Sequence, residues 1–359
     1  MSDKPKVLIF APREEPAENI KKVEELGCEI VIGNRDWQLP RTHYEDEVTA
    51  QARDCVALMG TSMRHTPISR RVMEASQRLR VVAKYTVGVD DIDTEAATEL
   101  GIMVCHAPTE SNCFGVAETT VAMMLHLFKK LADRDADVRE GKWRTTENFS
   151  YFLGARSSDG FRGQTIGFVG FGRIASRVAQ LLTPWRARLI AYDPYVQPAQ
   201  FLAHGVQAVD YETLLRESDL VSFHVVLTKE TRYMFGEEQI KLMRPHAVVV
   251  NTSRGKVIDE KAVAKAIEEG RLRGTAIDAF EEEPLPLDSP LRKLGNRALL
   301  SPHSASYTEG GELRQGVDWA FRSVITALKG NIPDNVYNKD VISLWKQRFG
   351  GVSLANTPT

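Results

Sequence analysis

The chain has 359 residues, more than one folding domain usually contains, so we expect two domains that each bury a core. A net charge of −2, with Lys and Arg spread along the chain, excludes the basic stripe of a nucleic-acid-binding protein and favours a small-molecule partner. The four cysteines lack metal-ligand spacing, so we expect reduced core thiols and no metal site. The sequence has no long apolar run, which predicts no membrane association and a cytoplasmic location.

Short apolar runs alternate with helical patterns over the first hundred residues. The runs are Val7–Phe10, Ile30–Ile32, Val56–Met59, Leu79–Tyr85 and Ile102–Cys105, and the clearest helices between them are Pro16–Leu26 and Thr94–Leu100. This alternation is typical of a parallel α/β sheet.

A second alternating series begins at Thr165. Its runs are Ile166–Val169, Leu189–Tyr192, Leu220–Val226, Ala247–Asn251, Thr275–Ile277 and Ala298–Leu300. Six strands with intervening helices predict a doubly wound nucleotide-binding domain.

Three further segments are distinctive. A long helical stretch is expected from Val116 to about Glu140, with an apolar face that bridges the domains or packs against another subunit. Thr145–Gly163 lacks periodicity and predicts an exposed loop, and a last helix is centred on Val317–Leu328.

Gly170, Gly172 and Ala175 form a GxGxxA motif between the first strand of the second series and a helix. The glycines permit a tight turn and close approach of a pyrophosphate, and the helix N-terminus attracts the phosphate charge. Asp193 ends the next strand 18 residues after Ala175, where a carboxylate can accept hydrogen bonds from ribose hydroxyls and repel a 2′-phosphate. The combination favours an NAD-binding site over the alternative, in which Gly170–Ala175 form an ordinary tight turn and Asp193 is a solvated acid at a strand end.

Three polar residues follow strand ends in the same half of the chain: Arg254, Glu283 and His303. In an open α/β sheet, ligands bind at the carboxyl ends of the strands. Taken singly, each has an ordinary alternative as a surface cation, one of three solvated acids, and a loop histidine. Taken together, they indicate a catalytic set.

The chain resembles the D-isomer-specific 2-hydroxyacid dehydrogenase family, which includes phosphoglycerate dehydrogenases and glyoxylate/hydroxypyruvate reductases. The segments that carry the resemblance are Gly170–Ala175, Asn251–Gly255, Asp278–Pro284 and Pro302–His303. It implies an NAD-binding Rossmann domain (109–305) inserted into a flavodoxin-like substrate domain (1–108 with 306–345), followed by a tail (346–359).

The resemblance implies catalytic roles for Arg254, Glu283 and His303 in hydride transfer between nicotinamide and C2 of a small 2-oxo or 2-hydroxy acid. A guanidinium can bind the substrate carboxylate bidentately and polarise the neighbouring carbonyl, which suits Arg254. An imidazole exchanges a proton near neutral pH, and a carboxylate on its other nitrogen favours the imidazolium, which suits His303 and Glu283.

Further positions follow from the same resemblance. The substrate carboxylate is expected on the backbone amides of Val87 and Gly88. The expected cofactor contacts are Thr120, Gly170, Gly172, Arg173, Ile174, Asp193, His224, Thr231, Thr252, Asp278 and His303. His224 could equally be a strand-end histidine, and Arg64, His106 and Glu110 are weaker candidates for contact with the substrate side chain.

The chain departs from the family pattern at several positions. Val226 stands where the family usually has Pro, Gly115 where it usually has Ser, and Ser304–Ser306 in place of a glycine-containing turn. Two rival functions remain open: a phosphite dehydrogenase, which keeps the same three residues, and an NAD-sensing corepressor. The family also implies a homodimer, with Val116–Glu140 as its expected interface.

Overall fold

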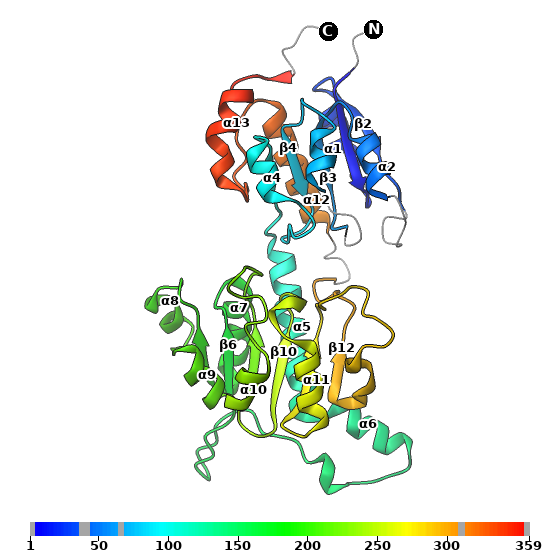
Figure 1. The fold of residues 1–359 in the computed structure, drawn as a ribbon. Helices are drawn as coiled ribbons and strands as arrows, with labels where there is room; N and C mark the ends of the chain where they lie inside the picture. Colours follow the sequence, from blue (N-terminus) through cyan, green and yellow to red (C-terminus); the bar gives the residue numbers. More distant parts are fainter. Residues whose placement is uncertain (1–3, 36–43, 64–67, 308–312, 355–359) are drawn as a thin grey trace. The chain divides into compact units, whose positions relative to one another are not determined.

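The computed structural model describes residues 4–35, 44–63, 68–307 and 313–354, and in it the chain divides into two compact units. The first comprises Met1–Asn112 and Glu309–Thr359, and the second comprises Cys113–Thr308. Figure 1 accordingly colours the first unit with both ends of the chain, blue to cyan and orange to red.

The first unit contains a five-stranded parallel sheet in the order β2-β1-β3-β4-β5. Its strands are β1 (Lys6–Ala11), β2 (Glu29–Ile32), β3 (Cys55–Gly60), β4 (Val81–Lys84) and β5 (Met103–Cys105). This order is that of flavodoxin-like folds. The helices are α1 (Ala17–Glu24), α2 (Tyr44–Gln51), α3 (Arg70–Glu74), α4 (Thr94–Glu99), α12 (Arg314–Leu328) and α13 (Ile342–Phe349).

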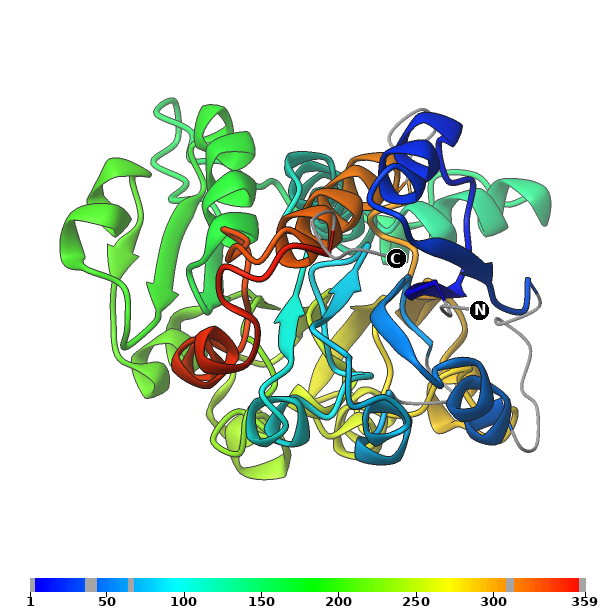
Figure 2. The same ribbon diagram turned by 90° about the horizontal axis from the view of Figure 1, so that it is seen from above.

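Helix α12 joins the two ends of the chain in one core. It packs on β3 and β4 and lies beside α1, where the Asn19 side chain donates to Asp318 Oδ1 at 2.7 Å. The orange and dark blue helices are adjacent in the view of Figure 2.

The second unit contains a seven-stranded parallel sheet in the order β12-β11-β10-β9-β6-β7-β8. Its strands are β6 (Thr165–Val169), β7 (Arg188–Tyr192), β8 (Gln207–Ala208), β9 (Leu220–Phe223), β10 (Ala247–Asn251), β11 (Leu272–Ile277) and β12 (Ala298–Leu300). The order reverses between β6 and β9, as in dinucleotide-binding folds. The prediction of two doubly wound parallel sheets is confirmed.

Helices surround this second sheet. They are α5 (Glu110–Lys129), which begins at the boundary of the units, α6 (Leu131–Arg139), α7 (Arg173–Leu182), α8 (Pro198–Ala203), α9 (Tyr211–Glu217), α10 (Glu237–Leu242) and α11 (Glu260–Glu268). Short 3₁₀ turns occur at Thr146–Asn148, Thr183–Trp185, Gly255–Val257, Pro290–Lys293, Gly295–Arg297 and, in the first unit, Lys339–Val341.

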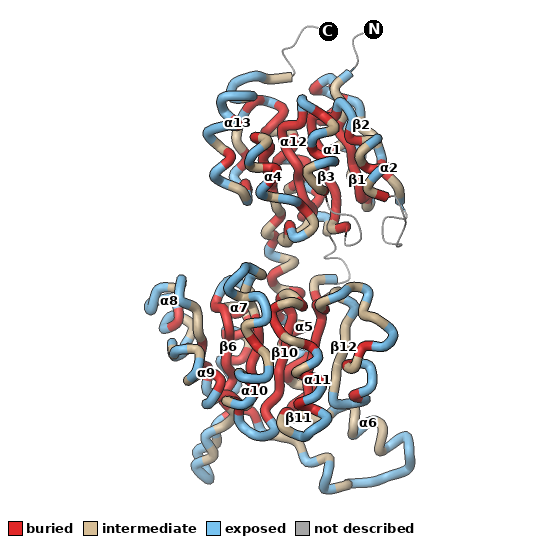
Figure 3. Tube along the Cα trace, in the orientation of Figure 1, coloured by how far each residue is buried: buried red, intermediate tan, exposed pale blue. Residues whose placement is uncertain are grey.

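Each unit has its own core on both faces of its sheet. The central strands β3, β4, β6, β9 and β10 are buried throughout, because helices cover both faces of a parallel sheet. Figure 3 shows this as continuous red along the strands, with exposed positions mainly on helices and loops.

The predicted long helix from Val116 to Glu140 is instead two helices. The chain breaks at Lys130, whose backbone is left-handed with φ of 49°. The apolar face of α5 packs into the core through Met124 and Phe128, whereas no residue of α6 is buried.

The sequence predicts a tail from residue 346, but in the structure α13 continues to Phe349. Trp345 is fully buried, and its indole Nε1 donates to the carbonyl of Arg80 at 2.9 Å. The Arg80 guanidinium in turn donates to the carbonyl of Val352 at 2.6 Å. Ile342, Trp345 and Phe349 share a helical face, which explains why this segment docks on the first unit.

Candidate active site

The loops that follow the strands of the second unit carry almost all of the predicted site residues. Because every strand pairing in this sheet is parallel, all of these loops leave the same edge. The loops after β6, β7, β9, β10, β11 and β12 carry, respectively, Gly170–Ala175, Asp193, His224, Thr252–Arg254, Asp278 with Glu283, and His303.

The glycine turn after β6 has the geometry that a dinucleotide site needs. Gly170 has φ of +84°, and a Cβ there would lie 2.9 Å from the backbone carbon of His224. A Cβ on Gly172 would meet no atom within 4 Å, so the backbone at the start of α7 faces open space. The first amides of α7 can therefore receive a phosphate.

Asp193 is held against this turn by both of its carboxylate oxygens. Oδ2 accepts a hydrogen bond from the Phe171 amide at 2.8 Å, and Oδ1 accepts one from the Tyr195 amide at 2.9 Å. The acid is thereby placed beside the glycine turn.

His224 follows β9, next to the glycine turn. Its Nε2 lies 2.9 Å from the Ser222 hydroxyl, and its ring packs against Phe168 at 5.9 Å between centroids. Burial lowers the pKa of His224 to about 3, so this imidazole stays neutral even at mildly acidic pH, where an exposed histidine becomes protonated.

Two of the predicted cofactor threonines meet, and a third does not join them. Thr120 is fully buried, and its hydroxyl lies 2.9 Å from that of Thr252. The half-buried Thr231 instead closes a local turn, in which its hydroxyl donates to the carbonyl of Val226 at 2.6 Å.

The Arg254 loop is shaped by Asn251 and Gly255. The Asn251 amide donates to the carbonyl of Arg254 at 2.9 Å, and its oxygen accepts hydrogen bonds from Ser253. A Cβ on Gly255 would lie 1.8 Å from the carbonyl carbon of Phe280, so only glycine allows this backbone contact. The loops after β10 and β11 are therefore locked together.

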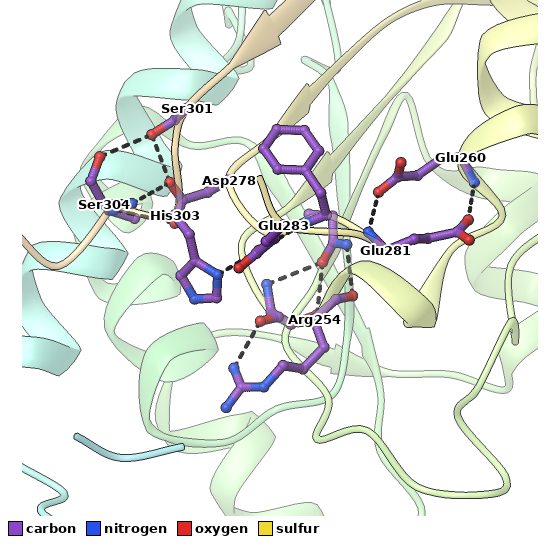
Figure 4. A network of polar contacts seen from close by, with 12 residues as sticks. Arg254, Glu260, Asp278, Glu281, Glu283, Ser301, His303 and Ser304 are labelled. Carbon is purple, nitrogen blue, oxygen red and sulfur yellow. Dashed lines mark hydrogen bonds and ion pairs between the residues drawn. The ribbon is translucent and has the colours of Figure 1, made fainter. Parts of the chain in front are cut away.

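Glu283 and His303 form the predicted pair. Glu283 Oε1 lies 2.7 Å from His303 Nδ1 and also accepts a hydrogen bond from the Phe280 amide at 3.0 Å. The side chains are 15% and 30% exposed, so the pair is enclosed while the imidazole keeps access to a ligand. Figure 4 shows this contact, with Arg254 on the neighbouring loop.

Asp278 supports the turn that carries His303. Its Oδ1 accepts hydrogen bonds from the Ser301 hydroxyl at 2.6 Å and the Ser304 amide at 2.9 Å, and its Oδ2 accepts one from the Ala305 amide at 3.2 Å. His303 itself has a left-handed backbone, with φ of 52°. A structural task for Asp278 was not evident from the sequence.

Glu260 and Glu281 form a second arrangement that sequence reasoning missed. Each carboxylate accepts a hydrogen bond from the backbone amide of the other residue, at 2.6 and 2.9 Å (Figure 4). The Tyr233 hydroxyl also donates to Glu281 Oε2 at 3.0 Å. This exchange connects the start of α11 to the loop of Glu283, and no local sequence signal distinguishes it from two solvated acids.

Gly115 and Ser306, two departures from the family pattern, lie against each other. A Cβ on Gly115 would be 3.3 Å from Ser306 Cα, so α5 approaches the segment after His303 closely. One turn later, the Thr119 hydroxyl donates to the carbonyl of Ala305 at 2.9 Å. The small residue at position 115 thus has a local steric reason.

Val87 and Gly88 lie in the first unit, in the loop after β4. Val87 O is 3.2 Å from His106 Nδ1, and Gly88 O accepts a hydrogen bond from the Thr86 hydroxyl at 3.0 Å. Glu110 is exposed at the start of α5, and Arg64 lies outside the described residues.

All four cysteines are free and buried, as expected.

Within residues 4–35, 44–63, 68–307 and 313–354, no group of three or more His, Cys, Asp or Glu side chains is arranged to hold a metal ion. The helices in these ranges are all too short or too polar to cross a membrane.

Comparisons with known proteins agree on one family. The model of the D-isomer specific 2-hydroxyacid dehydrogenase NAD binding domain matches residues 121–305. The chain is 38% identical to a glyoxylate reductase of Korarchaeum cryptofilum, covering 94% of this chain and 97% of the relative. It is 37% identical to a glyoxylate reductase of Thermococcus litoralis, covering 95% and 98%.

Two further similarities broaden the comparison. A D-3-phosphoglycerate dehydrogenase of Methanocaldococcus jannaschii is 36% identical, with 93% of this chain and 59% of that protein covered. The crystal structure of the TT0316 protein from Thermus thermophilus superposes with a TM-score of 0.78 at 28% identity, covering 92% of this chain and 99% of that one.

Proposed function

The chain belongs to the D-isomer-specific 2-hydroxyacid dehydrogenase family and is an NAD-dependent oxidoreductase of 2-oxo and 2-hydroxy acids, and from this premise we propose that it reduces glyoxylate with Arg254, Glu283 and His303 as catalytic residues. The observation that carries the proposal is the 2.7 Å contact between His303 Nδ1 and Glu283 Oε1, beside the loop of Arg254. It combines a proton donor, a charge that stabilises it, and a cation for the substrate.

In the proposed reaction, His303 protonates the substrate oxygen. NAD, when bound, would supply the hydride for C2. The developing alkoxide takes a proton from His303 Nε2, because Nδ1 is directed to Glu283. The carboxylate of Glu283 stabilises the imidazolium and sets the orientation of the ring. In the oxidation direction, the same imidazole accepts the proton.

Arg254 is proposed to bind the substrate carboxylate and to polarise the carbonyl that receives the hydride. A guanidinium has the planar, bidentate geometry that a carboxylate requires. The backbone contact at Gly255 supports this role, since it holds the Arg254 loop against the loop of Glu283. Val87 and Gly88 are proposed to bind the same carboxylate through their backbone amides.

For the cofactor, we propose that NAD lies on the glycine turn at Gly170, Gly172, Arg173 and Ile174, with its ribose on Asp193. The open space at Gly172 and the two hydrogen bonds that hold Asp193 beside the turn support this arrangement. Thr120, His224, Thr231, Thr252, Asp278 and His303 are proposed to line the remainder of the cofactor site.

Glyoxylate is the proposed acid because the relatives from Korarchaeum and Thermococcus, which the chain matches over nearly their whole length, are named glyoxylate reductases. The phosphoglycerate dehydrogenase at 36% identity makes 3-phosphohydroxypyruvate the main competitor. A direct comparison of the two acids is therefore needed.

The test follows NADH oxidation with glyoxylate, hydroxypyruvate, pyruvate, phenylpyruvate and 3-phosphohydroxypyruvate. We expect the highest kcat/KM with glyoxylate, and a loss of about 100-fold or more in His303→Ala. His246→Ala is the matched control, because His246 is also left-handed, with φ of 67°, but precedes β10 at the opposite edge of the sheet. NADH binding without turnover of any acid would instead favour the phosphite or corepressor alternatives.

We also propose that the protein is a homodimer that uses α6 and the segment after it. Five large apolar side chains in this region are 48–74% exposed, namely Leu131, Val138, Trp143, Phe149 and Phe152. Contiguous exposed apolar side chains commonly mark protein interfaces. The interface is thus proposed at and beyond α6, whereas α5 packs its apolar face into the core.

A cytoplasmic location is proposed on the basis of the cysteines. Cys28, Cys55, Cys105 and Cys113 are all free and buried, which suits a reducing compartment. Fractionation of the source cells with an antibody to this chain would test the location, and recovery from an extracellular fraction would contradict it.

A further inference from the structure

Lys84, the last residue of β4, is a fully buried lysine within the first unit. Its Nζ lies 2.5 Å from Asp91 Oδ2, donates to the carbonyl of Thr61 at 2.9 Å, and lies 5.6 Å from the centre of the Phe10 ring. Desolvation offsets most of the attraction within a buried ion pair, and apolar side chains of similar volume often stabilise a fold equally well. Fold stability alone is therefore a weak explanation for this pair.

The contacts of the pair join three segments of the chain. Lys84 and Asp91 stand at the two ends of the loop that contains Val87 and Gly88, so their contact closes that loop at its base. Asp91 Oδ2 also accepts a hydrogen bond from the Met63 amide at 2.7 Å, which attaches the segment after β3 to the same point.

The loop inside this closure presents two backbone donors. The carbonyls of Val87 and Gly88 are bound by the side chains of His106 and Thr86, respectively. Thr86 is in turn 3.1 Å from the Ser62 hydroxyl. Among the residues that the structure describes, the N–H groups of Val87 and Gly88 have no partner, and both residues are half-buried. Two successive donors of this kind make a receptor for an anion.

We propose that Lys84 and Asp91 are positioning residues for the 2-oxo acid, which hold the Val87 and Gly88 amides in the orientation that binds the substrate carboxylate. The inference rests on the carboxylate-binding role proposed above for these two amides. Lys84 does not touch the substrate in this account: it acts through the loop that its ion pair closes. The pair therefore sets the affinity for the acid, and the cofactor site in the second unit is independent of it.

The test compares Lys84→Met with the double variant Lys84→Met/Asp91→Asn. The single variant leaves a buried carboxylate without its cation, so we expect a lower Tm. The double variant removes both charges, while the Asn oxygen still accepts the Met63 amide, so we expect a Tm close to that of the wild type. Arg70→Met is the control, because it breaks the exposed pair of Arg70 with Glu99 in the same unit.

In the double variant, we expect the KM for glyoxylate and the inhibition constant of oxalate to rise about tenfold or more, with a smaller change in kcat. The KM for NADH stays at the wild-type value, and the backbone amides of Ile92 and Ala107, which donate to the carbonyls of Val89 and Thr86 in this loop, exchange hydrogen faster than in the wild type. A stable double variant with wild-type KM and wild-type amide exchange would overturn the inference.

Failure of the proposed function gives a different result. It appears in the wild-type protein itself, as the absence of NADH oxidation with every acid tested. In such an inert protein, hydrogen exchange still decides the structural part of the inference: unchanged exchange of the Ile92 and Ala107 amides in the double variant would refute it without any measurement of turnover.

Discussion

His303 has a left-handed backbone, which costs a non-glycine residue roughly 1–3 kcal/mol and persists only where the surroundings impose it. Here Asp278 supplies the constraint, since its carboxylate binds Ser301, Ser304 and Ala305 on either side of the histidine. The turn and Glu283 together therefore fix the orientation of the imidazole, and in the proposed mechanism Asp278 acts through the backbone as well as through any contact with NAD.

Replacing Glu283 with Gln should lower kcat for glyoxylate reduction about 100-fold. The amide keeps the shape of the side chain but removes the charge that stabilises the imidazolium. His303 then loses its proton at a lower pH, so the pH above which reduction declines should also fall. The measurement is kcat against pH; Glu282→Gln, on the neighbouring acid, is the control. An unchanged profile would show that Glu283 does not act on the proton donor.

Asp193→Asn should weaken the preference for NADH over NADPH by about tenfold, since it removes the charge that repels a 2′-phosphate. In the wild type, the two carboxylate oxygens of Asp193 accept hydrogen bonds from the Phe171 and Tyr195 amides, and asparagine keeps one side-chain oxygen for such a bond. The ratio of kcat/KM for the two cofactors measures the effect, with Asp210→Asn, the exposed N-cap of α9, as control. An unaltered ratio would place the ribose elsewhere.

Helix α11 begins with Glu260, and burial raises the pKa of this carboxyl to about 7, against a hydrogen bond from the Glu281 amide that lowers it. The folded protein binds this proton more tightly than the unfolded chain. The contribution of Glu260 to stability is therefore complete below about pH 4.5 and is lost as pH rises to about 7.

Glu260→Gln should consequently gain stability relative to the wild type as pH rises. We expect the difference in Tm, variant minus wild type, to be larger at about pH 8 than at about pH 5. Glu268→Gln lies on the exposed side of the same helix and should show no such trend. A difference in Tm that does not depend on pH would contradict the raised pKa.

Helix α13 is expected to be essential for the stability of the first unit. Trp345→Ala removes a fully buried indole and its hydrogen bond to Arg80, so the free energy of unfolding of this unit should fall by about 3–5 kcal/mol. Leu344→Ala, one residue earlier and 37% exposed, should cost about 1 kcal/mol or less. Urea unfolding followed by Trp fluorescence distinguishes them, and equal losses would contradict the docking of α13.

The strands were predictable because burial on both faces leaves continuous apolar runs, and every run named from the sequence overlaps an observed strand. The two-residue edge strand β8 was not predictable, since Gln207 and Ala208 are exposed. The break at Lys130 was missed because no glycine or proline marks it. The GxGxxA motif with Asp193 was enough to predict an NAD site. The Glu260–Glu281 and Lys84–Asp91 contacts depend instead on tertiary proximity, which periodicity does not contain.

For the whole molecule, the proposed dimer depends on the apolar side chains of α6 and the residues after it. Trp143→Glu or Phe149→Glu should convert a dimer to a monomer, because a charge buried in an interface carries a large desolvation cost. Size-exclusion chromatography with light scattering measures the mass. Leu287→Glu, at a side chain 90% exposed elsewhere in the second unit, should leave the dimer intact. A monomeric wild type at micromolar concentration would refute the proposal.

The contacts of Gly115 with Ser306 and of Thr119 with Ala305 join the first and last segments of the second unit. The first unit joins its own two ends in the same way, through the Ser111 hydroxyl and Gln315 Oε1 at 3.1 Å. Residues 113–307 are therefore a domain inserted into the first unit, with its two ends close together, and each unit keeps its own core. Such a layout lets recombination exchange the whole module that carries the proposed NAD site and catalytic residues, while the first unit and its Val87–Gly88 loop stay unchanged.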